Sequence, residues 1–321
     1  MEKVYLGVDV GSVSTNIVGI DERESVIFSK YLRNDGQPLE VIQDGLKKID
    51  HEFVNLKVMG VGTTGSGRLL AGTMLGADII KNEITAHAYA AVHFHPEVRA
   101  IIEIGGQDSK LIMIANGVVS DFSMNTVCAA GTGSFLDHQA ERLKVPIEDF
   151  GDLALTARKR VRIAGRCTVF AESDMIAKQQ FGFSKAEIIN GLCDALVRNY
   201  LNNLGRDKLI LAPVLFQGGV AANKGIKASF ERELHTPVIV PTYFNVMGAI
   251  GAALLARKQL RKIGCDTKFR GFEQLLLDFS PTSFECEGCS NCCEVIQVEQ
   301  EQRIIAIWGD KCGKYSNRIS A

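Results

Sequence analysis

Two cysteines that lie far apart in the chain have similar sequence surroundings. Cys128 precedes a stretch of alanine, glycine and threonine, and Cys167 follows a glycine and an arginine. We expect a helix to begin at each cysteine, over residues 128–143 and 167–181. A helix N-terminus stabilises a thiolate, and small neighbours leave space for a bulky inorganic cluster.

Two thiolates are half of the protein ligands that a [4Fe–4S] cluster needs. A homodimer whose two-fold axis passes through the cluster would supply the other two from the second copies of Cys128 and Cys167. On these residues alone, two ordinary buried or capping cysteines are the alternative.

A turn of small residues near the N-terminus is suited to phosphate. Gly11 permits a tight turn, and Asp9, which ends the preceding strand, would face a magnesium ion through water, because magnesium gives up its hydration reluctantly. N–H and O–H donors at the tip would bind phosphate oxygens as a backbone nest does. These donors come from Ser12, Ser14 and Thr15. No Gly-Lys-Ser/Thr follows, so the turn is not a Walker A loop, and an ordinary Gly-Ser turn is the alternative.

The same pattern recurs later in the chain. Residues 8–17 align without a gap with residues 102–111, and each copy reads as a strand, an acid, a glycine-centred turn and a returning strand. In the second copy, Gln107 and Asp108 would orient water or metal at the terminal phosphate, beside the acid Glu103. The glycines of this turn are Gly105 and Gly106. Two related lobes would then bind one polyphosphate from opposite sides.

A third glycine-containing segment, residues 216–223, follows a strand and opens a helix. Gly218 and Gly219 would allow a nucleoside to come close to the backbone, and Asn223 ends the segment. Each of the three segments is weak evidence alone. Their order along the chain is the one expected of a two-lobed nucleotide-binding fold: a first phosphate loop, a second phosphate loop and an adenosine loop.

The chain as a whole alternates short β-branched runs with longer amphipathic runs, which predicts an α/β protein. The late strands are expected at 209–211 and 238–240. We predict a first lobe over residues 1–82 and a second over 83–262, whose final helix, 244–262, returns to the first lobe. A cysteine-rich extension would occupy residues 263–321.

Composition narrows the class of protein. The 321 residues are 46% hydrophobic and 23% charged, with a formal net charge of −1, so nothing recruits nucleic acid or an anionic membrane. The most apolar run, residues 246–256, is too short to span a bilayer, and the N-terminus lacks a secretory pattern, so we expect a cytoplasmic protein. Nine cysteines, an odd number, indicate metal or redox chemistry rather than a disulfide framework.

Together these motifs resemble the ATP-dependent activators of 2-hydroxyacyl-CoA dehydratases, with the related benzoyl-CoA reductase ATPase subunits and double-cubane-cluster protein reductases. The resemblance covers about Lys3 to Gln259. It rests on the strings DVGSVSTN (9–16), NEITAHA (82–88), EIGGQDSK (103–110), CAAGTGSFL (128–136), RCTVFAESDM (166–175) and QGGVA (217–221).

The resemblance implies a duplicated actin/hexokinase-like (ribonuclease H-like) ATPase fold and an oxygen-sensitive homodimer. It implies one [4Fe–4S] cluster on Cys128 and Cys167 of each subunit, ATP or ADP with Mg²⁺ in the nucleotide site, and a partner iron–sulfur enzyme that accepts single electrons of low potential. Ferredoxin or flavodoxin would be the donor. Many family members have lysine where this chain has Asn16, which leaves Lys110 or another base to supply positive charge to the phosphates.

Two other functions remain on the sequence alone. A metabolite kinase of the same fold would need a carboxylate base near the transferred phosphate, for which Asp108 is the ready candidate. A non-enzymatic actin-like assembly protein would give no reason for cysteines at two helix starts.

The C-terminal cysteines form a separate group with the spacing C-x2-C-x2-C-C followed by one more. This spacing suits a small zinc knuckle or a second iron–sulfur site, with reduced thiols on a mobile tail as the alternative. The residues are Cys286, Cys289, Cys292, Cys293 and Cys312. Cys193 and Cys265 have no partner at ligand spacing, and we expect them to be buried small residues.

Overall fold

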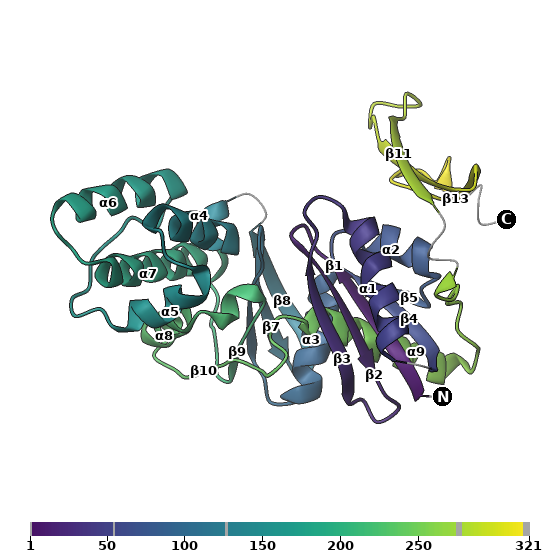
Figure 1. The fold of residues 1–321 in the computed structure, drawn as a ribbon, viewed down its shortest axis with the longest axis horizontal. Coiled ribbons are helices and arrows are strands. Elements are labelled where there is room, and N and C mark those ends of the chain that lie inside the picture. The colour runs from purple at the N-terminus through teal and green to yellow at the C-terminus, as the bar shows by residue number, and fades with distance from the viewer. Residues whose placement is uncertain (1, 54, 126–127, 274–277, 317–321) are drawn as a thin grey trace. The chain divides into compact units, whose positions relative to one another are not determined.

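A computed structural model describes residues 2–53, 55–125, 128–273 and 278–316 of the chain (Figure 1). Two residues of the first cysteine motif, Thr126 and Val127, therefore lie outside the described part. The chain divides into two compact units, each with its own core: Met1–Asn82 together with Ala252–Ala321, and Glu83–Gly251. The first boundary follows Asn82, and the second lies inside a helix.

The first unit contains a mixed five-stranded sheet with two helices. Its elements are β1 (Glu2–Val10), β2 (Ser14–Ile20), β3 (Val26–Arg33), α1 (Pro38–Glu52), β4 (Leu56–Thr64), α2 (Arg68–Leu75) and β5 (Ile79–Ile80). The strand order is β3-β2-β1-β4-β5, with β1 antiparallel to β2 and parallel to β4. Seven consecutive residues of β1 are buried, as expected for a central strand covered on both faces.

The second unit repeats this arrangement and adds helices. Its elements are α3 (Glu83–Phe94), β6 (Ala100–Ile104), β7 (Ser109–Ala115), β8 (Val118–Asn125), η1 (Ala129–Gly131), α4 (Gly133–Leu143), α5 (Ile147–Leu155), α6 (Thr168–Gln180), α7 (Lys185–Leu204), β9 (Val214–Gln217), η2 (Gly219–Ala222), α8 (Lys224–Leu234) and β10 (Val238–Ile239). The strand order β8-β7-β6-β9-β10 matches the first sheet strand for strand. The gapless alignment of the two hairpins thus reflects a duplicated sheet.

Helix α7 forms the centre of the second unit. It is buried along most of its length and packs against α5, α6 and α8. A capping box defines its start: the Ser184 hydroxyl accepts the Glu187 N–H, and the Glu187 carboxylate accepts the Ser184 N–H.

Two expectations about local structure are wrong. Leu209 and Leu211 are 73% and 38% exposed and form no strand within the described second unit. The strand is the next apolar run, β9, because its four residues are buried and pair with β6. The helix expected over 128–143 is interrupted, since the N–H and hydroxyl of Thr132 both bind the Ala129 carbonyl and close a short 3-10 turn before α4 begins.

Helix α9 (Met247–Ile263) contains the second boundary, and a small sheet follows it. That sheet is antiparallel, in the order β11 (Phe279–Glu285), β12 (Glu294–Gln300) and β13 (Arg303–Trp308). Cys265, expected to be buried, is instead exposed just after α9. Among the described residues, none of the helices combines the length and apolar character that crossing a bilayer requires.

Close packing of β4 against α9 provides a test of this fold. A Cβ added at Gly62 would lie 2.1 Å from the backbone carbonyl oxygen of Ala252, which cannot move aside easily. We expect Gly62→Ala to cost about 1–3 kcal/mol of stability, measured by chemical denaturation.

The matched control is Gly60→Ala on the same face of β4. There the nearest atom is Cδ1 of Leu260, the end of a flexible side chain, so the cost is expected to be smaller. Equal losses in the two variants would contradict the proposed packing of α9.

Candidate functional site

The first phosphate-loop candidate is held by a residue that sequence reasoning missed. The N–H of Gly11 donates to the Ser14 carbonyl (2.9 Å), which closes the turn. Asn34, buried just after β3, donates from Nδ2 to the Gly11 carbonyl (2.7 Å) and accepts the Thr15 hydroxyl (2.6 Å). The Thr15 hydroxyl is therefore committed to the fold, whereas Ser12 at the tip is exposed.

Asp9 and Asn16 lie opposite each other at the base of this hairpin. Both are buried, and Oδ1 of Asn16 has no hydrogen-bond partner among the described residues. A buried polar atom of this kind is normally satisfied by water or a ligand. The pair is therefore suited to a hydrated cation or a phosphate-bound water.

The second loop repeats the geometry of the first. The N–H of Gly105 donates to the Asp108 carbonyl (3.0 Å), as Gly11 does to Ser14. Glu103 lies opposite Lys110 in the strand register, as Asp9 lies opposite Asn16 in the first hairpin. Gln107 is exposed at the tip. The two hairpins thus differ mainly in charge.

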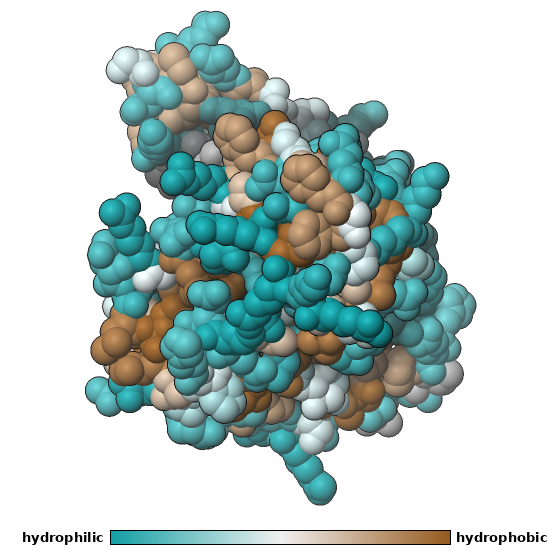
Figure 2. Space-filling view, turned by 90° about the vertical axis from the view of Figure 1, so that its left-hand side faces the viewer, coloured by the Kyte–Doolittle hydropathy of each residue, from teal (hydrophilic) through white to brown (hydrophobic). Residues whose placement is uncertain are grey.

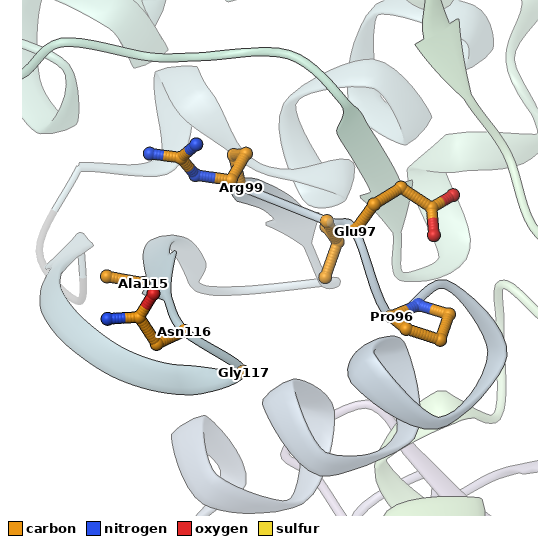
Figure 3. A pocket seen from close by; sticks show the side chains of 7 residues that line it. Pro96, Glu97, Arg99, Ala115, Asn116 and Gly117 are labelled. Carbon is orange, nitrogen blue, oxygen red and sulfur yellow. The ribbon is translucent and has the colours of Figure 1, made fainter.

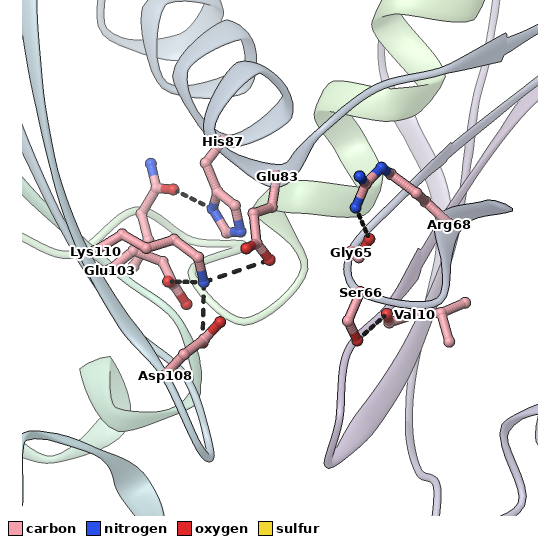
Figure 4. Close-up of polar contacts among 10 residues, drawn as sticks. Val10, Gly65, Ser66, Arg68, Glu83, His87, Glu103, Asp108 and Lys110 are labelled. Carbon is pink, nitrogen blue, oxygen red and sulfur yellow. Dashed lines mark hydrogen bonds and ion pairs between the residues drawn. The ribbon is translucent and has the colours of Figure 1, made fainter. Parts of the chain in front are cut away.

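Lys110 is the centre of an ionic cluster in the second unit (Figure 4). Its ammonium, 2% exposed as a residue, lies 2.9 Å from Glu103, 2.9 Å from Asp108 and 3.4 Å from Glu83. Burial lowers the pKa of Lys110, but the three carboxylates outweigh it and raise the pKa above its ordinary value. Lys110 is therefore a permanent cation that offsets part of the negative charge of the three carboxylates.

Glu83 is the carboxylate that helix α3 contributes to this cluster. Burial, opposed by Lys110 and assisted by Asp108 and Glu103, raises the pKa of Glu83 above 4.5. One turn later, Nδ1 of His87 lies 2.9 Å from Oε1 of Gln217 at the end of β9. Helix α3 is thereby tied to two strands of the second sheet.

In the third candidate segment, residues 216–223, Gly218 and Asn223 serve the fold while Gly219 is exposed. Gly218 has a φ of 87°, and a Cβ there would lie 2.3 Å from the Ile104 carbonyl, so only glycine fits between the two strand ends. Gly219 is exposed. Asn223 caps α8, since its Oδ1 accepts the Ile226 N–H (3.0 Å), so this side chain serves the helix.

The two cysteine loops lie in the second unit. Cys128 is half-buried and precedes the short turn η1; Asn125 binds its N–H (2.9 Å) and its carbonyl (2.7 Å). Cys167 is also half-buried and is the N-cap of α6.

Asn199 of α7 lies close to both loops. Its Nδ2 donates to the Gly165 carbonyl (2.6 Å), two residues before Cys167. Its Oδ1 would lie 3.0 Å from a Cβ at Gly131, three residues after Cys128. Both predicted ligand loops therefore pack near one asparagine, which is hydrogen-bonded to the Cys167 loop, and nothing in the sequence spacing indicated this contact.

The Cys128 segment is hydrogen-bonded to the second phosphate-loop candidate. The N–H of Gly133 donates to the Gly105 carbonyl (2.9 Å), and the N–H and hydroxyl of Ser134 donate to the Gly106 carbonyl (2.8 and 2.6 Å). Tyr200, next to Asn199, donates to the Lys110 carbonyl (2.6 Å). The second hairpin turn and the Cys128 segment are therefore parts of one hydrogen-bonded assembly.

A profile of the BadF/BadG/BcrA/BcrD ATPase family matches residues 6–256. The chain belongs to this family. It is 35% identical over 266 residues to the (R)-2-hydroxyglutaryl-CoA dehydratase activating ATPase of Acidaminococcus fermentans, covering 80% of this chain and 98% of that protein. The match confirms the resemblance to the dehydratase activators.

Two solved structures are similar in fold to this chain. The activator of the 2-hydroxyisocaproyl-CoA dehydratase from Clostridium difficile, with bound ADPNP, superposes with a TM-score of 0.74 at 31% identity, covering 81% of this chain and 97% of that one. A ROK family glucokinase from Streptomyces griseus reaches 0.50 at 14% identity, covering 79% and 99%. The predicted actin/hexokinase-like fold is confirmed.

One cavity of the second unit lies away from the hairpin turns described above. One cavity of about 330 Å³ is lined by Pro96–Arg99 and Ala115–Gly117 (Figure 3). It lies at the start of β6, whereas the phosphate-loop candidate follows the end of that strand. This cavity is therefore separate from the residues assigned to the nucleotide.

The ionic cluster predicts a pH-dependent stability. Because the pKa of Glu83 is raised in the folded state, its ionisation disfavours folding, and the associated stability is lost as the pH rises above the ordinary value of 4.5. Glu83→Gln should therefore raise the midpoint of urea denaturation at neutral pH, with the difference shrinking near pH ~4.

Glu40→Gln, on the first turn of α1, is the control. Glu40 is exposed and is not one of the carboxylates paired with Lys110. A Glu83→Gln variant that is less stable than wild type at neutral pH and equal at acid pH would show the opposite sign and contradict this assignment.

Proposed function

We propose that this protein is an ATP-dependent, low-potential electron donor. It hydrolyses ATP and passes single electrons from a [4Fe–4S] cluster, shared across a homodimer, to a partner iron–sulfur enzyme such as a 2-hydroxyacyl-CoA dehydratase or a double-cubane-cluster protein. The observation that carries this proposal is the hydrogen bonding of the Cys128 segment to the carbonyls of Gly105 and Gly106.

The residues present fit a cluster. Cys128 and Cys167 are both half-exposed and lie in loops that pack near Asn199. Small residues beside each cysteine leave space. When bound, a [4Fe–4S] cluster supplies one-electron redox chemistry. The chain itself orients the thiolates and ties them to the nucleotide loop.

The face that carries α6 has the character of an interface. Beginning directly after Cys167, this helix and its C-cap expose large apolar side chains, among them Val169 (65%), Phe170 (63%) and Phe181 (73%). Figure 2 shows apolar residues gathered among charged ones on this side of the molecule. A second copy covering this region would bury them and complete the ligand set, as an isologous dimer requires.

A basic segment precedes Cys167. Between residues 158 and 166 the chain has five exposed arginine or lysine residues and no acid. Such a concentration of charge steers an acidic protein towards the exposed cysteine loop and speeds their association. An acidic electron carrier, a ferredoxin or flavodoxin, is the corresponding donor.

Nucleotide contacts are assigned in each unit separately. In the first unit, the tip of the Gly11 turn would donate to phosphate, and Asp9 with Asn16 would hold water of a hydrated Mg²⁺. In the second unit, three carboxylates outnumber Lys110, which leaves excess negative charge suited to a cation. Asp108 is ion-paired to Lys110, which disfavours it as the free base that a metabolite kinase needs.

ATP hydrolysis would act through the second loop. Loss of the terminal phosphate changes what Gly105 and Gly106 bind, and their carbonyls hold the N-terminus of α4 by hydrogen bonds. The ATP and ADP states then make different contacts at Cys128, as a coupled switch requires.

Iron content after anaerobic purification tests the cluster. Cys128→Ala and Cys167→Ala should each lose most of the iron and the associated absorbance, because each removes one ligand type from both subunits. Cys265→Ser, at an exposed cysteine outside both loops, is the control and should keep its iron. Full iron content in Cys128→Ala would overturn the assignment.

The Ser134 hydroxyl tests the coupling. Ser134→Ala removes one of the hydrogen bonds to Gly106, worth about 0.5–1.5 kcal/mol, and should reduce the ATP-induced increase in chelation of cluster iron by roughly 2- to 10-fold. ATP hydrolysis should stay near the wild-type rate.

Ser120→Ala removes a similar serine-to-carbonyl hydrogen bond on β8 and should leave chelation unchanged. If ATP changed iron chelation in Ser134→Ala as much as in the wild type, this hydrogen bond would not take part in the coupling.

A further inference from the structure

The C-terminal sheet and its loops, residues 279–316 and here called the tail module, have very little core. The residues of β11 are almost all exposed, and the buried residues of the module are Cys286, Cys293, Val295 and Val298. Segments below about 40 residues usually need a metal, disulfides or a partner to fold. The tail module also lies beyond residues 6–256, so the family match does not account for it.

Two cysteines face each other where β11 and β12 begin to pair. The N–H of Cys286 donates to the Cys293 carbonyl (2.8 Å), directly beyond the paired residues Glu285 and Glu294. Both cysteines are buried, 5% and 9% exposed, and pack together with Val295. The loop between the strands therefore begins and ends on cysteine side chains inside the small core.

The loop turns tightly over the first of these sulfurs. The N–H of Gly288 donates to Sγ of Cys286 (3.4 Å), and Cys289 follows at once. A backbone N–H directed at sulfur fixes the orientation of the side chain, as hydrogen bonds to metal ligands do. Cys286 and Cys289 thus have both the spacing and the hydrogen bond expected of a two-cysteine metal-binding turn.

The segment that carries Cys312 lies against this turn. Asp310 accepts the N–H groups of Tyr315 (2.7 Å) and Ser316 (3.2 Å), which folds the backbone around Cys312. The Tyr315 ring packs on the Cys286–Cys293 cluster, and Nζ of Lys314 would lie 3.3 Å from a Cβ at Gly288. A cation beside the turn would offset part of the negative charge of a four-cysteine metal site.

We propose that the tail module binds one zinc ion through four thiolates, in a closed structural site. The ligands are Cys286, Cys289, Cys293 and Cys312. Zinc takes four such ligands at about 2.3 Å, and each loses its proton on binding. No three His, Cys, Asp or Glu side chains in the described ranges have already converged on one point. Closing the site therefore requires the thiols to rotate about χ1.

Cys292 is left out of the ligand set. It is exposed, its backbone is left-handed (φ 41°), and its thiol lies 3.9 Å from the Cys289 carbonyl oxygen. A single ion is favoured over a second cluster because residues opposite each other on paired strands have Cβ atoms only about 4.5–5.5 Å apart. That separation suits two sulfurs on one metal.

Metal analysis of the full-length chain, produced with zinc and iron present, tests the proposal. The wild type should hold about one zinc ion per chain, Cys289→Ser and Cys312→Ser should lose most of it, and Cys292→Ser should keep it. Cys128→Ala should keep the zinc while losing iron, which separates this site from the proposed cluster. Zinc absent from the wild type, or lost equally in Cys292→Ser, would overturn the proposal.

Cysteine alkylation of the wild type keeps the test independent of variant folding. Peptide mass spectrometry should show that a zinc chelator makes the four ligand cysteines reactive while Cys292 reacts with or without it. Equal reactivity of all five before chelation, or iron with sulfide bound in place of zinc, would also overturn it.

Discussion

Hydrogen bonds to the carbonyls of Gly105 and Gly106 are the constraint on which the candidate site depends. They come from Gly133 and Ser134, just after the Cys128 loop, so the second hairpin turn and the start of α4 cannot move independently. The contact requires small residues, because a Cβ at Gly133 would lie 3.0 Å from the Gly105 oxygen. Gly133 of the CAAGTGSFL motif therefore serves packing against the second hairpin turn, a role separate from the proposed space for a cluster.

The duplicated sheets carry different chemistry at equivalent positions. Asn16 and Lys110 occupy the same place opposite an acid in their hairpins, but only Lys110 is enclosed by three carboxylates. The second hairpin is also the one whose turn binds the cysteine-bearing segment and whose strand accepts Tyr200. In the proposed function, the first unit would supply uncharged hydrogen-bond donors to phosphate. The second unit would supply Lys110 with its carboxylates and the connection to Cys128.

Much of the fold follows from local sequence, because a strand–turn–strand unit repeated without a gap predicts paired hairpins. The side chains that hold the loops were not predictable in this way. Asn34 acts on Gly11 and Asn199 acts on Gly165 across long stretches of chain, and an isolated asparagine carries no signal of such a partner. The interruption at Thr132 was not predicted, because threonine is an ordinary helix residue and its two bonds to the Ala129 carbonyl leave no mark in the sequence. Leu209–Leu211 is apolar enough to be predicted as a strand, but whether a neighbouring strand pairs with it cannot be read from the sequence.

The most direct test of the account is whether the nucleotide changes the electronic environment of the cluster. Electron paramagnetic resonance of the reduced, iron-loaded homodimer would be compared with ADP and with a non-hydrolysable ATP analogue bound. Different spectra are expected in the two states, because the Gly105–Gly106 turn, the proposed phosphate contact, is hydrogen-bonded to the Cys128 segment. Identical spectra at saturating nucleotide would contradict it.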